Sequence, residues 1–189
     1  MKTSSPRNKL KPVQKLSELP KSLRNTPIRE LFQYHNDAMP FKKYTKAQLL
    51  VCMCMDNRKQ LRLPDNFAYI LRTGGGNVRY SEFKIAFAVA IGGVRHIALI
   101  AHNKCGMVNL ASKRAAFIRG LVKNAGWSKK RAEDYFYSFS PMFEIVNEID
   151  FVIDEARRLA AQYPKAKIVP LFYLLEDGKL YLLKDYKYE

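Results

Sequence analysis

The apolar positions of the chain form short continuous runs and helical stripes that alternate along the sequence. Runs at residues 48–54, 67–72 and 96–101 are too short for helices and are typical of buried strands. Helical spacing of apolar residues follows at 79–91, 107–123, 128–139 and 143–163. Two last runs, 167–175 and 180–183, flank Glu176-Asp177-Gly178-Lys179, which is typical of a hairpin. This alternation predicts an α/β fold, with a mostly parallel central sheet flanked by helices and an antiparallel C-terminal edge strand.

The N-terminal quarter has a different character and predicts two parts, a basic and partly helical arm over 1–45 and an α/β domain over 46–189. Four prolines stand among lysines and serines before residue 28. Thr26-Pro27 resembles a helix start, and the next turns carry apolar residues that should be buried against something. These residues are Ile28, Leu31, Phe32 and Tyr34. We therefore expect a dimer to which the arm contributes.

Composition restricts the class of protein. Of 189 residues, 48% are hydrophobic, which excludes a disordered chain. We expect no membrane span, because no stretch of 18 apolar residues occurs, and no secretory signal, because the first residues lack an apolar segment. Three cysteines are too few and odd in number for a disulfide scaffold. These features favour a cytoplasmic protein.

The chain is strongly basic, and its basic residues are unevenly distributed. The chain has 33 Lys and Arg against 17 Asp and Glu, a formal net charge of +16. Residues 1–46 alone hold eleven basic side chains against three acidic ones. Such an arm could bind nucleic acid or another anionic surface, although no nucleic-acid motif supports this and a solvated arm is the simpler interpretation.

Candidate chemistry collects where the predicted strands end. Cys54 ends the first strand, His102 follows the third, and Cys105 lies three residues further on. In a parallel sheet the carboxyl ends of neighbouring strands meet at one edge, so these side chains should converge. Two thiolates and one imidazole suit zinc best, and three protein ligands leave the fourth tetrahedral position for water. That pattern is typical of a catalytic rather than a structural zinc site.

In this arrangement the sequence resembles the β-class carbonic anhydrases. The family's two motifs, Cys-x-Asp-x-Arg and His-x-x-Cys-Gly, are here Cys54-Met55-Asp56-Asn57-Arg58 and His102-Asn103-Lys104-Cys105-Gly106. The family's Arg-Asn-Ala-Gly turn is here Arg72-Thr73-Gly74-Gly75, so Thr73 and Gly74 depart from the pattern. The resemblance covers about residues 46–183.

The resemblance implies a zinc enzyme that converts carbon dioxide and water reversibly to bicarbonate and a proton. Cys54, His102 and Cys105 would be the zinc ligands. Asp56 would either pair with Arg58 or turn onto the metal and close the fourth position. Three glycines would border the substrate pocket: Gly74, Gly75 and Gly106. Assembly as a homodimer or a dimer of dimers is expected.

Two other functions remain open at this point. Hydrolysis of a linear carbon dioxide analogue, carbonyl sulfide or carbon disulfide, would use the same ligands. Alternatively the protein is non-catalytic, with a structural zinc ion and an arm that binds an anionic partner. The pairing of Asp56 with Arg58 argues against the second, because a structural zinc site needs neither residue.

Overall fold

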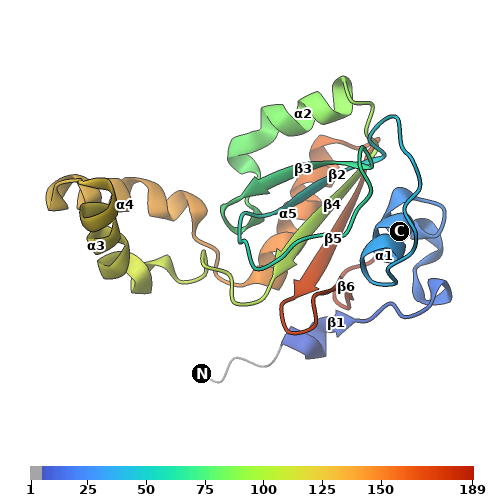
Figure 1. Ribbon diagram of the computed structural model, residues 1–189, viewed down its shortest axis with the longest axis horizontal. Coiled ribbons are helices and arrows are strands. Elements are labelled where there is room, and N and C mark those ends of the chain that lie inside the picture. Colours follow the sequence, from blue (N-terminus) through green and yellow to red (C-terminus); the bar gives the residue numbers. More distant parts are fainter. Residues whose placement is uncertain (1–5) are drawn as a thin grey trace.

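The computed structural model describes residues 6–189 and has a six-stranded sheet at its centre (Figure 1). The strand order is β1-β6-β5-β4-β2-β3. The strands are β1 (Leu10–Lys11), β2 (Leu49–Cys54), β3 (Ala68–Thr73), β4 (His96–His102), β5 (Lys167–Leu174) and β6 (Lys179–Leu183). The runs interpreted as strands in the sequence are therefore strands.

Four neighbouring strands run parallel, as the alternation of strands and helices predicted. β2 pairs in parallel with both β3 and β4, and β4 pairs in parallel with β5. β6 returns antiparallel to β5 through the predicted hairpin. The short β1 pairs antiparallel with the outer side of β6, so the first described residues complete that edge of the sheet.

Helices cover both faces of the sheet. They are α1 (Pro27–His35), α2 (Glu82–Ala90), α3 (Arg114–Ala125), α4 (Lys129–Phe143) and α5 (Glu148–Gln162). α2 and α5 pack on one face, against side chains such as Cys52 and Leu99. α1 packs on the other face, against side chains such as Val51 and Ile100. Strands with two covered faces are apolar at nearly every position, which explains the unbroken runs in β2 and β4.

The residues before β2 belong to the same hydrophobic core as the sheet. Five apolar side chains there are at most 1% exposed: Leu19 directly after one 3-10 helix, Leu23 in the next, and Ile28, Leu31 and Phe32 in α1. The burial of Ile28, Leu31 and Phe32 was predicted, and it takes place against this chain's own sheet. Burial of the arm's apolar side chains therefore requires no second copy of the chain.

Shortening a buried side chain of α1 should destabilise the whole fold. We expect Leu31→Ala to lower the free energy of unfolding by about 2–5 kcal/mol, because a fully buried leucine leaves a cavity when shortened. Urea denaturation measures the change. The control is Leu16→Ala, whose side chain is on the surface at 37% exposed and should change stability by less than about 1 kcal/mol. Equal unfolding curves for the two variants would contradict the placement of α1 in the core.

The last long helix starts later than its apolar stripe suggested. α5 was predicted from residue 143 and begins at Glu148. The side chain of Asn147 accepts hydrogen bonds from the backbone N–H of Ile149 and Asp150, at 2.9 and 3.0 Å, and so caps the helix. Ile145 is instead extended and forms a parallel bridge with Val108. This bridge ties the start of α5 to the loop after β4.

The remaining helices are the α3–α4 hairpin and α2, whose outer side is apolar. α3 and α4 form a hairpin that stands away from the sheet (Figure 1), with Ile118, Ala132 and Phe136 as their buried residues. Phe83 on α2 and Ile91 directly after it point outward and are 81% and 73% exposed. Among residues 6–189, no helix is both long and apolar enough to cross a membrane.

Candidate metal centre

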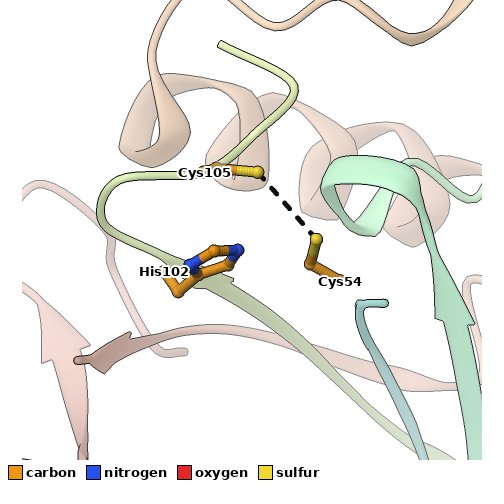
Figure 2. Close-up of side chains that lie close together, drawn as sticks. All are labelled: Cys54, His102 and Cys105. Carbon is orange, nitrogen blue, oxygen red and sulfur yellow. Dashed lines mark hydrogen bonds between the residues drawn. The ribbon is translucent and has the colours of Figure 1, made fainter. Parts of the chain in front are cut away.

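The topology brings the three predicted ligands together at one edge of the sheet. Cys54 is the last residue of β2 and His102 the last residue of β4, and these strands are parallel neighbours. Cys105 reaches the same point from the loop after β4 (Figure 2). The ligand atoms of Cys54, His102 and Cys105 lie within 4.8 Å of one another, and all three residues are buried. The arrangement could hold a metal ion.

The histidine is prepared to act as a ligand. Its Nδ1 lies 2.9 Å from the backbone carbonyl of Asn103, which fixes the proton on Nδ1. Its Nε2 is buried and has no hydrogen-bond partner among the described residues. A buried nitrogen lone pair without a partner is costly, and a metal ion between His102 and the two sulfurs would satisfy it.

The two sulfurs lie 3.9 Å apart and one stabilises the charge of the other. The Cys105 thiol, followed by the His102 ring and the Asp56 backbone, lowers the pKa of Cys54 to about 3 against the effect of burial. The Cys54 sulfur and burial raise the pKa of Cys105. Thiolate is the form that binds metal, so the pair already holds one ligand in its binding state.

Asp56 lies beside the ligands and is held by Arg58. The Arg58 guanidinium donates to both carboxylate oxygens, with Nη2 2.5 Å from Oδ2 and Nε 3.0 Å from Oδ1. The backbone N–H of Arg58 also donates to Oδ1, at 2.9 Å. These bonds hold the pKa of Asp56 well below its usual range. Asp56 Oδ2 is nevertheless only 3.9 Å from the Nε2 of His102. The carboxylate therefore borders the open side of the site, which is the side that none of the three ligands occupies.

Arg58 also joins the two motifs. Its Nη2 donates to the backbone carbonyl of Lys104 at 2.9 Å, in the loop between His102 and Cys105. Lys104 has a left-handed backbone, with φ of 55°. On the other side of this loop, the carboxylate of Glu148 accepts the backbone N–H of Cys105 at 3.2 Å. The loop that carries Cys105 is therefore fixed by Arg58, in the loop after β2, and by Glu148, at the start of α5.

Two further residues at the site were not singled out for this role from the sequence. Lys59 is completely buried and its Nζ donates to the carbonyl of Cys54 at 2.9 Å. Arg72 on β3 donates to the carbonyls of Cys54, Asp56 and Lys59 at 3.2–3.4 Å. Burial lowers the pKa of Lys59 to about 8, while Cys54, Asp56 and Cys105 act in the opposite sense. A lysine in a loop is normally exposed, so the sequence carried no signal of its burial.

Two cavities adjoin the ligands and share Met55, Gly106 and Met107. A cavity of about 480 Å³ is lined by Cys54 and the polar loop with Asp56 and Arg58. A cavity of about 400 Å³ lies between this loop and the α3–α4 hairpin, and its lining is mostly apolar, including Phe117, Phe136, Phe139 and Phe143.

The three glycines expected near a substrate pocket take different places. Gly106 lines both cavities, and Gly74 lines the apolar one. Gly75 is buried and is not among the lining residues. Its φ of +67° and the side chain of Met107, 3.3 Å from where a Cβ would lie, explain why glycine is needed there.

Comparison with known proteins finds a likeness to solved structures. No family model and no curated protein match the chain. A carbonic anhydrase from Glaciozyma antarctica superposes with a TM-score of 0.56 at 20% identity, over 86% of this chain and 98% of that one. A β-carbonic anhydrase from Trichomonas vaginalis gives 0.55 at 16% identity, over 89% and 100%. A carbon disulfide hydrolase gives 0.52 at 17% identity, over 84% and 87%. The chain therefore has the β-carbonic anhydrase fold.

Proposed function

We propose that the protein is a zinc-dependent enzyme that converts carbon dioxide and water reversibly to bicarbonate and a proton. The observation that carries the proposal is the position of Asp56. Its carboxylate is held by Arg58 and lies 3.9 Å from His102 Nε2, at the open side of the Cys54, His102 and Cys105 cluster. A structural zinc site needs no carboxylate held beside its ligands, because it has no open position.

Zinc fits the ligand set, because two thiolates and an imidazole are its usual donors and leave one position for a small ligand. When bound, the ion would supply a water molecule acidic enough to attack carbon dioxide. The chain's own residues would do the rest. Asp56 would accept a hydrogen bond from the attacking water and orient it, and Arg58 would keep Asp56 ionised and away from the ligands.

The cavities suit an uncharged substrate and a charged product. The mostly apolar cavity below the α3–α4 hairpin would admit carbon dioxide, which has no net charge. The cavity that contains Asp56 and Arg58 would receive bicarbonate, since the Arg58 side chain is 49% exposed there.

The test is stopped-flow measurement of carbon dioxide hydration with protein whose zinc content has been determined. We expect about one zinc per chain and hydration well above the uncatalysed rate. Zinc-replete, folded protein that does not accelerate hydration would overturn the proposal.

Hydrolysis of carbonyl sulfide or carbon disulfide is the second candidate. It is favoured by the apolar cavity and by the likeness in fold to a carbon disulfide hydrolase. All three molecules are linear and have a central carbon that water can attack, so the same ligands serve each reaction. Sulfide release from carbon disulfide, measured on the same preparation, would distinguish the two activities.

The non-catalytic alternative is less well supported. It assigns the function to a basic arm that binds an anionic partner, but much of the arm is packed on the sheet. It also leaves the pairing of Asp56 with Arg58 without a role.

Assembly is the last part of the proposal, as a homodimer or a dimer of dimers. Phe83 on α2 and Ile91 directly after it are exposed. They lie near β3, the strand at the edge of the sheet, where Tyr69 packs against Gly92. Edge strands and large exposed apolar faces are commonly covered in assemblies.

We expect sedimentation velocity to show a dimer or larger species, and Ile91→Glu to shift it towards the monomer. Val146→Glu is the control, because Val146 is 92% exposed and lies away from α2, between α4 and α5. A wild-type monomer at micromolar concentration would contradict the proposed assembly.

A further inference from the structure

The cavity between the metal-site loops and the α3–α4 hairpin is larger than the proposed reaction requires. Its volume is about 400 Å³, which is in the range of cavities that hold small organic ligands, whereas carbon dioxide is a much smaller molecule. Met55 and Met107 line it from the loops after β2 and β4. Five aromatic rings line it from the hairpin: Phe117, Tyr135, Phe136, Phe139 and Phe143. Such a lining suits a flat aromatic group, because rings pack well against other rings and against thioethers.

Lys113 is the one charged residue among those that line this cavity. It is the last residue of the 3-10 helix Leu110–Lys113, directly before α3. Its Nζ donates to the backbone carbonyls of Gly106, at 2.8 Å, and of Val108, which fix the ammonium group beside the cavity. In the part of the chain that the structure describes, no carboxylate forms an ion pair with Lys113.

The surroundings of Lys113 do not supply the missing negative charge. Residues 106–132 include seven Lys and Arg and no Asp or Glu. The two acidic residues of α4, Glu133 and Asp134, pair with lysines at the start of that helix. Glu144, directly after α4, accepts the backbone N–H of Leu110. A bound anion would therefore meet a positive side chain whose charge is not yet compensated.

We propose that this cavity binds an aromatic monoanion, with the ring system among the aromatic side chains of the hairpin and the acidic group at Lys113. A neutral arene would fill the same space without using the charge, and a small inorganic anion would use the charge without the rings. Because Met55, Gly106 and Met107 line this cavity and also the polar one beside Asp56, the occupant would restrict access to the metal centre. Binding itself depends neither on metal nor on turnover.

Isothermal titration calorimetry on the full chain compares 1-naphthoate with 1-naphthamide, which has the same ring system and no charge. We expect 1-naphthoate to bind with a dissociation constant of about 1 mM or lower, and 1-naphthamide about fivefold more weakly. Lys113→Met should remove this difference and Lys113→Arg should keep it. The matched control is Lys84→Met, which loses the same charge from an exposed position on α2 and should change neither constant by more than about twofold.

The aromatic lining is tested separately. Phe139→Ala removes one ring and Ser140→Phe fills the cavity from α4, so each should raise both dissociation constants about tenfold. Phe83→Ala is the control, because Phe83 lies on α2, is 81% exposed and does not line the cavity.

Three results would overturn the inference. Wild-type protein could bind the acid no more tightly than the amide, or bind neither because a second copy of the chain fills the cavity. In the third, Lys113→Met would still prefer the acid, which would place the carboxylate at the metal or elsewhere. Carbon dioxide hydration by the same preparation would in each case leave the proposed function intact. Protein that binds 1-naphthoate as expected but does not hydrate carbon dioxide would overturn the proposed function alone.

Discussion

Replacing His102 by alanine is expected to remove most of the zinc from the protein and to abolish carbon dioxide hydration. The imidazole is one of three buried ligands within 4.8 Å of one another, and two thiols alone form a much poorer zinc site. The free energy of unfolding of the metal-free protein should fall by about 1–3 kcal/mol, because alanine loses the Nδ1 hydrogen bond to the Asn103 carbonyl and leaves a cavity in place of a buried ring.

Metal analysis after gel filtration, together with circular dichroism, measures this result. The control is His96→Ala, because His96 lies at the opposite end of the same strand, β4. It should keep its zinc and its activity. Stoichiometric zinc in the His102→Ala protein would show that the ligands have been assigned wrongly.

The motifs of the site were the part of the sequence that predicted most about its structure. At 16–20% identity, the likeness to the structures described above is one of fold. The spacing of Cys54, Asp56 and Arg58, and of His102 and Cys105, was nevertheless sufficient to predict where they would meet. Each group follows a parallel strand, and the ends of β2 and β4 are fixed side by side by their hydrogen bonds.

What the sequence did not predict depends on contacts far along the chain. The start of α5 was placed too early because Ile145 fits the helical stripe, whereas its backbone bonds to Met107 instead. Burial of Leu31 was expected, but nothing local indicates that it faces β2 and β4 of the same chain. Lys59 was not singled out because burial of one loop lysine is decided by the surrounding fold and not by a motif.

The largest effect on catalysis without loss of metal is expected from Arg58→Ala. The Arg58 side chain supplies the hydrogen bonds that hold Asp56 from one side and bonds the Lys104 carbonyl on the other. Without it, Asp56 is free to turn towards the ligands, 3.9 Å away, and close the open position. We expect the rate of hydration to fall by at least about a hundredfold, which is the usual loss when one charge-stabilising group of an active site is removed. The zinc content should stay near one per chain.

Asp56→Asn tests the same pair from the other side. Asparagine keeps the shape but loses the charge that pairs with Arg58, so hydration should again fall by about a hundredfold. The Arg58 hydrogen bonds lower the pKa of Asp56, so in the wild type Asp56 is ionised throughout the neutral and alkaline range. An increase of activity with pH must then come from deprotonation of the attacking water, and not from Asp56.

Hydration rates from pH 6 to 9, with zinc measured in parallel, separate these roles. The wild type should be slow near neutral pH and faster in alkaline solution. Arg58→Lys should recover part of the lost rate, because lysine restores the charge but not the paired hydrogen bonds of the guanidinium. If Arg58→Ala and Asp56→Asn both retain zinc and near wild-type rates, the pair only shapes the loop after β2. The chemistry would then need a different group to orient the water, and the proposed role of Asp56 would fail while the metal centre remained.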